Sequence, residues 1–423
     1  CKRVCGREIG VANFFDLEKT NDIAICINCA QCAQACPVGA ITQVEDIDRV
    51  KEAVEDKDKI VIFNTAPAVR VALGEEFKMD AGSYVEDKMV HALRQLGGDY
   101  VFDVTFGADM TIMEEANEFV NRFVKGEKLP ILTSCCPAWV NFMEHEYPDL
   151  LQHLSTCKSP QSMFSPIARH YFAEKVLNKK YDEVIVMSIM PCVAKKFEVS
   201  REELGEDGYL DTDISLTTRE LARMIKEAGI ELDNLEEAEF DSPLGYSTGA
   251  ADIFGATGGV LEAALRTAYH DITKEEAPSL DFKEVRGMTG IKEASLEIAG
   301  HTVNVAATSS LGNARKLMDE LRQGNSKYHL IEIMACPGGC VAGGGQPFHG
   351  GDYEKVKARG AGLYAIDANK PKRKSHQNED IKKLYAEFLG ERGGHNAHTY
   401  LHTHYFDRSN PYAKKTEAEC TAE

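Results

Sequence analysis

Two cysteines stand side by side in the segment TSCCPAW. A disulfide between neighbouring residues would close a small, strained ring, so Cys135 and Cys136 are not expected to pair with each other. Three more cysteines follow in two further motifs, Cys192 in MPCVAKKFE and Cys336 and Cys340 in MACPGGCVAGGGQP. Thiolates are ligands for soft metals, so these five residues predict metal chemistry.

Each of the three motifs follows a predicted strand, where open α/β sheets present their functional groups. Four thiolates from such distant segments can enclose a [4Fe–4S] cube. Gly338 and Gly339, between Cys336 and Cys340, let the backbone bend closely around a bulky group. A buried cysteine can also be a small hydrophobic core residue, but that explanation suits five cysteines in three loops poorly. Four ligands leave one thiol of the adjacent pair for a different task.

A second group of cysteines lies near the N-terminus. The segment CINCAQCAQACP has the C-x2-C-x2-C-x3-C-P spacing of bacterial ferredoxins. Two such motifs normally share ligands, so we interpret CKRVC at the start of the chain as the end of the partner motif. The expected ligands of one [4Fe–4S] cluster are Cys5, Cys26, Cys29 and Cys32, while Cys1 and Cys36 would serve a second cluster whose other cysteines precede residue 1. The alternative is a zinc knuckle, which needs four ligands but lacks this spacing and the trailing proline.

Composition limits the classes of function. The chain has 423 residues, 43% of them hydrophobic, enough for two or three domains. A net charge of −19 argues against nucleic acid and anionic membranes as partners. The sequence contains no run of about eighteen apolar residues and no signal-like N-terminus, so we expect a soluble protein. Thirteen clustered cysteines favour metal binding in a reducing, cytoplasmic compartment. Because the first residue is not Met, we expect the chain to be a fragment.

The elements that position these cysteines divide into three segments. Residues 1–50 form a cysteine-rich segment with little room for a conventional core. Residues 51–365 alternate short apolar strands with amphipathic helices, as in KIVIFNTAPAVRVALGEEF, which predicts an α/β domain of mainly parallel sheets in two lobes. Residues 366–423 begin with the basic segment NKPKRKSH and predict one amphipathic helix near 378–389 and a polar tail.

Smaller signals complete this interpretation. Thr217 and Glu220 form a capping box that predicts a helix start, and Gly229 is a suitable stop. Cys157 is expected to be a buried structural thiol, and Cys420 belongs to the tail. The His-rich segment GGHNAHTYLHTHY could suggest metal, but its spacing favours packing or solvation.

The three cysteine motifs resemble the signature motifs of the [FeFe]-hydrogenase catalytic (large) subunits, and the similarity extends over about residues 1–365. The resemblance implies a bacterial ferredoxin-like α+β domain at the N-terminus, followed by a two-lobed H-cluster domain. It also implies the H-cluster, a [4Fe–4S] cube joined through one cysteine sulfur to a two-iron subsite with CO, cyanide and a dithiolate amine bridge. Carried over by position, the cube ligands are Cys136, Cys192, Cys336 and Cys340, with Cys340 as the bridging ligand. Cys135 is then the free thiol that exchanges protons with the amine.

The same resemblance assigns residues around the two-iron subsite. Lys195 resembles the lysine that hydrogen-bonds a cyanide ligand, although by spacing alone it could be a surface residue beside Lys196. The other residues expected in the pocket are Ala66, Pro67, Gln161, Met190, Phe254, Gly255 and Met334. Methionines in such positions are otherwise ordinary core residues.

A proton path is expected on one helix face. In TIMEEANEFVNR, Glu115, Glu118 and Arg122 share a single face, which by periodicity alone indicates a solvated charged stripe. The resemblance instead implies a path from Cys135 through Glu115, Ser155 and Glu118 to Arg122. Hydroxyl and carboxyl groups suit this role because they both accept and donate protons.

The expected function is therefore reversible H₂ oxidation and proton reduction in an anaerobe. Two alternatives are the iron–sulfur assembly relatives, which lack the two-iron subsite, and the sensory relatives, which often replace the free thiol. Cys135, Lys195, Met334 and the GGGQP segment argue against both. We expect the catalytic subunit to work in a larger assembly with diaphorase or formate dehydrogenase subunits, or with free ferredoxin, and to need maturation enzymes.

Overall fold

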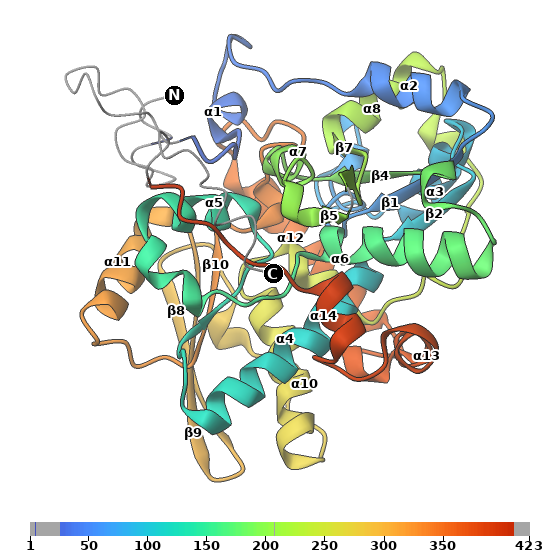
Figure 1. Ribbon diagram of the computed structural model, residues 1–423. Helices are drawn as coiled ribbons and strands as arrows, with labels where there is room; N and C mark the ends of the chain where they lie inside the picture. The colour runs from blue at the N-terminus through green and yellow to red at the C-terminus, as the bar shows by residue number, and fades with distance from the viewer. Residues whose placement is uncertain (1–4, 6–25, 207, 410–423) are drawn as a thin grey trace.

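Two separate sheets organise the protein. The computed structural model describes residue 5 and residues 26–206 and 208–409. Within this part of the chain, two four-stranded sheets lie in different halves of the molecule, with helices around them (Figure 1). Six pairs of neighbouring strands make up these two sheets, and five of these pairs are parallel. The expected two-lobed α/β architecture with mainly parallel sheets is confirmed.

The first sheet has the strand order β2-β1-β4-β7 and is parallel throughout. Its strands are β1 (Ile60–Thr65), β2 (Tyr100–Asp103), β4 (Val184–Met190) and β7 (Ile214–Thr217). Their side chains are buried almost without interruption. A parallel sheet covered on both faces requires such continuous apolar runs, which explains why VIVMSIM shows no polar alternation.

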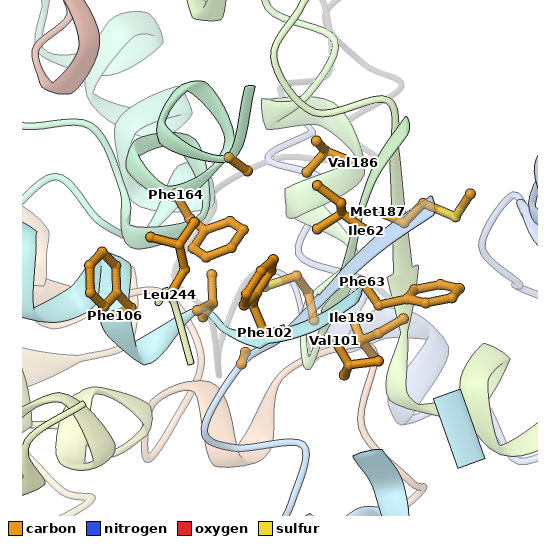
Figure 2. Close-up of a cluster of buried hydrophobic side chains, with 14 of the residues drawn as sticks. Ile62, Phe63, Val101, Phe102, Phe106, Phe164, Val186, Met187, Ile189 and Leu244 are labelled. Atoms are coloured by element: carbon orange, nitrogen blue, oxygen red, sulfur yellow. The ribbon is translucent and has the colours of Figure 1, made fainter. Parts of the chain in front are cut away.

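The core around this sheet is rich in aromatic side chains. Figure 2 shows Phe102 of β2 next to Phe164, with Ile62 and Val186 on the neighbouring strands. Phe102 and Phe172 meet edge to face with ring centroids 4.9 Å apart, an arrangement that aromatic quadrupoles favour. This packing holds the sheet rigidly beneath the loops that follow its strands.

The second sheet has the order β3-β10-β9-β8. Its strands are β3 (Ile131–Leu132), β8 (Ile291–Ile298), β9 (His301–Ser309) and β10 (Leu330–Met334). Strands β8 and β9 form an antiparallel hairpin, and the turn residues Ala299 and Gly300 have φ of 51° and 80°. Positive φ at both turn positions matches the twist of a two-residue hairpin. Strand β8 alternates more and less exposed residues, as expected for an edge strand with one solvated face.

Helices cover both sheets. They are α1 (Gln31–Gln34), α2 (Ile47–Glu55), α3 (Glu86–Gln95), α4 (Thr105–Lys125), α5 (Pro137–Glu146), α6 (Pro160–Pro166), α7 (Ala194–Glu198), α8 (Thr218–Glu227), α9 (Gly249–Asp252), α10 (Gly259–Thr273), α11 (Leu311–Arg322), α12 (Tyr353–Asn369), α13 (Glu379–Leu384) and α14 (His395–Leu401). A small hairpin joins β5 (Gly205–Glu206) to β6 (Tyr209–Leu210). The capping box at Thr217 and Glu220 begins α8, and Gly229 follows its end with φ of 68°.

Two local expectations differ from the structure. The segment after β1 forms a short 3-10 helix, Leu73–Phe77, instead of a full α-helix. The polar tail expected after the helix near 378–389 contains α14, whose Ala397 and Leu401 are buried in the core of the first sheet. A backbone hydrogen bond from Lys158 N–H to Leu401 O (2.9 Å) fixes the end of α14. Such burial depends on distant partners that a local polar pattern does not reveal.

Candidate active site

Three loops bring five cysteines to one cavity between the lobes. Cys135 and Cys136 follow β3 and precede α5, Cys192 follows β4, and Cys336 and Cys340 follow β10. All five line a cavity with about 840 Å³ of space not filled by protein atoms, and its walls are mostly apolar. The strand ends therefore bring these five thiols to the lining of one cavity.

Burial dominates the electrostatics of these thiols. It raises the pKa of Cys192 to about 12, with a further increase from Cys136 and a partial offset from Lys195. Burial also raises the pKa of Cys136. The backbone N–H groups of Ala138 and Trp139, at the start of α5, act in the opposite direction and lower this pKa. Thiols in such a dry site ionise only when a cation replaces their protons. The donor set therefore fits an iron–sulfur cube, whose positive iron atoms supply that charge.

Glycines allow the loops to approach each other closely. A Cβ at Gly343 would lie 2.1 Å from Pro191 O, and one at Gly344 would lie 2.1 Å from Cys29 O. A Cβ at Gly345 would meet the Cys192 backbone nitrogen at 2.9 Å. The segment GGGQP thus packs its backbone directly on the Cys192 loop and on the N-terminal cysteine motif, and side chains would separate them.

The other residues expected around the two-iron subsite also surround the cavity. Its lining includes Ala66, Pro67, Gln161, Met190, Phe254, Gly255 and Met334. They come from both lobes, since Ala66 and Met190 belong to the first sheet region and Met334 ends β10. The structure brings all seven residues to the lining of one cavity.

Lys195 supplies a buried positive charge in the lining of this cavity. Its Nζ donates to Ser159 Oγ at 2.7 Å and to Glu198 Oε2 at 2.5 Å. Burial lowers the lysine pKa, but the Glu198 carboxylate more than offsets this, so the pKa of Lys195 is raised overall. Sequence reasoning missed Glu198 and Ser159. The spacing of three residues between Lys195 and Glu198 on α7 is a signal that could have identified the ion pair.

Among the residues of the expected proton path, hydrogen bonds join Ser155, Glu118 and Arg122. Burial raises the pKa of Glu115 to about 8, with an opposing contribution from contact with Ser155 and a further increase from Glu118. Ser155 Oγ donates to Glu118 Oε2 at 3.0 Å, and Arg122 Nη2 donates to Glu118 Oε1 at 2.5 Å. Cys135 is close enough for the Glu115 charge to raise its pKa further.

The outer two residues of this expected path are more exposed than the inner two. Glu115 is 2% exposed and Ser155 fully buried, whereas the Glu118 and Arg122 side chains are 13% and 11% exposed. Glu118 and Arg122 also line a polar pocket at the surface. The sequence missed the backbone N–H of Thr156, which donates to Glu118 Oε2 at 3.0 Å and fixes its carboxylate.

The N-terminal cysteines lie beside the cavity. Burial raises the pKa of Cys5 to about 11, and Cys26 and Cys32 raise it further. The pKa of Cys29 is likewise raised by burial and by Cys32, Cys5 and Cys26, so these four thiols are close enough to influence one another's charge. Cys29 lines the cavity as well and contributes to the raised pKa of Cys336.

Of the two cysteines expected to serve a second cluster, the structure describes Cys36. Cys36 Sγ accepts a hydrogen bond from Ala40 N–H at 3.2 Å. Backbone N–H groups, that of Val38 first, lower its pKa. Cys1 lies outside the described residues.

Family comparison identifies this arrangement. Residues 59–344 match the family described as iron only hydrogenase large subunit, C-terminal domain, and residues 353–408 match the iron hydrogenase small subunit. The chain belongs to the iron-only hydrogenase family. Membership in it implies iron–sulfur cofactors, and the cysteine-lined cavity has the matching donor set.

Several hydrogenases are similar over most of this chain. The NADP-reducing hydrogenase subunit HndD of Solidesulfovibrio fructosivorans is 51% identical over 390 residues, 91% of this chain and 66% of its own length. Iron hydrogenase 1 of Clostridium pasteurianum is 45% identical, and the match covers 87% of this chain and 65% of that protein. The chain thus spans just under two thirds of the length of both relatives.

A solved structure and a more distant protein group complete the comparison. A single-residue variant of the [FeFe]-hydrogenase HydA1 from Chlamydomonas reinhardtii superposes with a TM-score of 0.77 at 39% identity, covering 86% of this chain and 99% of that chain. Cytosolic iron-sulfur assembly component 3 of Bos taurus is 30% identical and covers 90% of this chain and 82% of its own. Among the described helices, none is long and apolar enough to cross a membrane.

Proposed function

We propose that the chain is the catalytic subunit of an [FeFe]-hydrogenase that interconverts H₂ with protons and electrons. The observation that carries this proposal is the fifth thiol. Of the six cysteines that line the cavity, Cys29 belongs to the N-terminal motif, so the three strand-end loops present one cysteine more than a cube requires. Burial and then the charge of Glu115 raise the pKa of Cys135, the cysteine left over. An assembly factor that only holds cubes has no use for a free thiol next to a proton acceptor.

Each part of the site has a task in this function. Cys136, Cys192, Cys336 and Cys340 would hold the cube, and Cys340 would also hold the two-iron subsite. When bound, the H-cluster would supply the redox-active iron that activates H₂. Lys195 would donate hydrogen bonds to an anionic ligand from a dry wall, where a charge-assisted bond is strong. The apolar lining excludes water from the reacting centre.

Proton movement would use side chains of this chain alone. Cys135 would pass a proton to Glu115, whose pKa of about 8 suits exchange near neutral pH. Ser155 would connect Glu115 with Glu118, and Arg122 lies where that route reaches the surface pocket. The greater exposure of Glu118 and Arg122 than of Glu115 and Ser155 supports the outward direction.

Electrons would travel through the N-terminal cysteines. Cys5, Cys26, Cys29 and Cys32 would hold a [4Fe–4S] cluster, and Cys36 with Cys1 would contribute to a second one. The contact between Gly344 and the Cys29 backbone supports a short route from the cavity to the first cluster.

The electron carrier is proposed from similarity. HndD is named as a subunit of an NADP-reducing hydrogenase, so we expect this chain to work with a diaphorase-type partner in the cytoplasm, where NADP(H) is used. Formate dehydrogenase subunits or free ferredoxin are the alternatives that we expected from the sequence.

Infrared spectroscopy with gas measurement tests the proposal. Protein produced with the maturation enzymes should show CO and cyanide bands and evolve H₂ from a reduced viologen, whereas protein made without them should do neither. Loaded protein that lacks both the bands and H₂ evolution would instead support an assembly function. Full turnover of the monomer with ferredoxin, and none with NADPH in the presence of the partner subunits, would refute the diaphorase assignment.

A further inference from the structure

Two histidines and a glutamate form a second candidate metal site, outside the cysteine cavity. His270 lies near the end of α10, Glu276 in the loop that follows it, and His376 after α12. One ligand atom from each lies within 4.8 Å of the other two. We propose that these three residues bind a divalent transition metal with the preferences of Zn²⁺.

Two ring nitrogens of this cluster have no hydrogen-bond partners among the described residues, although Nδ1 of His270 lies 3.8 Å from Asp271 Oδ1. His376 is only 9% exposed, and its Nε2 has none; the buried Nδ1 of His270 has none either. Buried polar atoms without partners cost free energy, and native structures rarely keep them without a reason. A metal ion would satisfy both nitrogens.

The separation of the donor atoms suits a tetrahedral ion. His376 Nε2 lies 3.6 Å from Glu276 Oε2, which is too long for a hydrogen bond. Two donors about 2.0 Å from one zinc ion at a tetrahedral angle are about 3.3 Å apart. If the His376 and Glu276 side chains move slightly towards each other, both atoms can therefore bind one zinc ion.

The second ring nitrogen of His376 already has a partner that orients the ring. Its Nδ1 lies 3.2 Å from the hydroxyl of Thr267, a fully buried residue of α10. Histidine ligands normally use their other ring nitrogen in this way, which fixes the ring for metal binding.

His270 must turn to join the site. Its ring stacks on His376 with centroids 4.2 Å apart and an angle of 10° between the planes. A metal cannot lie in both planes of such a stack, but the His270 side chain is 35% exposed and has space to rotate. The ion would also replace the Lys374 ammonium that now contacts Glu276, and water would complete the tetrahedron.

In two other groups of possible metal ligands, the side chains already have hydrogen-bond or ion-pair partners. In the cluster of Glu118, Cys157 and His402, both ring nitrogens of His402 are engaged, with Thr156 Oγ1 at 2.7 Å and Glu114 Oε2 at 3.0 Å. The acidic cluster of Glu262, Asp281 and Asp367 is paired with arginines. Only the His270 cluster, among the described groups of this kind, has open nitrogens on two rings.

A metal ion bound at this site would link two segments of the chain. His270 and Thr267 lie within the segment that matches the large-subunit family, whereas His376 lies in the segment that matches the small-subunit family. A bound ion would join these segments at the end of α10.

Zinc binding to the cluster-loaded protein tests the inference. The protein is titrated with Zn²⁺ against a chromophoric chelator, and bound zinc and iron are counted after dialysis. We expect one zinc per chain in the wild type and in C157A, which removes the competing cluster. H376Q and E276Q should lose this zinc with unchanged iron content, and because Glu276 is a half-exposed loop residue we expect E276Q to fold normally. T267V should weaken binding by about 10–100-fold, as expected for an outer-shell partner.

A second readout separates binding from accidental adsorption. Zinc should raise the thermal unfolding midpoint of the wild type and of the control H301Q, an exposed histidine of β9, but not that of E276Q. Equal zinc binding by the wild type, E276Q and H376Q would overturn the inference. Loss of zinc in C157A alone would overturn it as well, because it would place the ion at Glu118 and His402.

Discussion

Ser155 donates a hydrogen bond from its hydroxyl to Oε2 of Glu118 at 3.0 Å. The backbone of Ser155 is fixed in turn, since its N–H donates to Leu132 O of β3 at 2.8 Å. Strand β3 also leads directly to Cys135. One strand therefore positions both Cys135 and the hydroxyl that we propose to connect Glu115 with Glu118 of α4.

Ser155→Ala should slow H₂ turnover strongly while leaving the cofactor in place. The methyl group can neither accept nor donate a proton, and a positioned proton-transfer group contributes roughly 10²–10⁴ in rate. Turnover and the CO and cyanide infrared bands are measured together. The control is Ser188→Ala, because Ser188 is equally buried but lies in β4, outside the path. Similar rates for both variants would contradict a relay through Ser155.

The adjacent cysteines should respond in opposite ways to substitution. Cys135→Ala should abolish most turnover, again by roughly 10²–10⁴, with unchanged iron content and infrared bands. Cys136→Ala removes an assigned ligand and should strip or disorder the cube. Iron analysis with spectroscopy distinguishes the two variants. Loss of iron in the Cys135 variant and its retention in the Cys136 variant would show that the assignments are reversed.

Much of the fold and site could be predicted because the signals are local. Apolar runs such as VIVMSIM and the capping box at Thr217 depend on neighbouring residues, and motif spacing places the cysteines at strand ends. The contacts that the sequence did not reveal are long-range. Nothing near Thr156 in the sequence indicates that its hydroxyl meets His402, 246 positions away. The helix α14 was missed for the same reason, because its burial comes from distant partners.

Glu115 should make stability depend on pH. Burial raises its pKa from 4.5 to about 8, so the folded protein keeps a proton that the unfolded chain releases at lower pH. The stabilisation is complete below pH 4.5 and is lost as the pH rises through about 8. The thermal midpoint of the wild type should therefore fall more between about pH 5 and pH 8 than that of Glu115→Gln. Parallel curves for the two proteins would show that Glu115 titrates normally.

Gly344→Ala should separate the N-terminal cysteine motif from the cavity. A Cβ at this position would lie 2.1 Å from Cys29 O and 2.8 Å from Ala30 Cβ, and the backbone carbonyl cannot rotate away as a flexible side chain could. Inserting a methyl group into such a contact typically costs about 1–3 kcal/mol. We expect a lower thermal midpoint and loss of the electron paramagnetic resonance signal of the reduced N-terminal cluster, with the infrared bands of the cavity retained. Gly360→Ala is the matched control, because a Cβ in the middle of α12 meets nothing within 4 Å. If both variants keep the N-terminal signal, the GGGQP segment does not hold that motif in place.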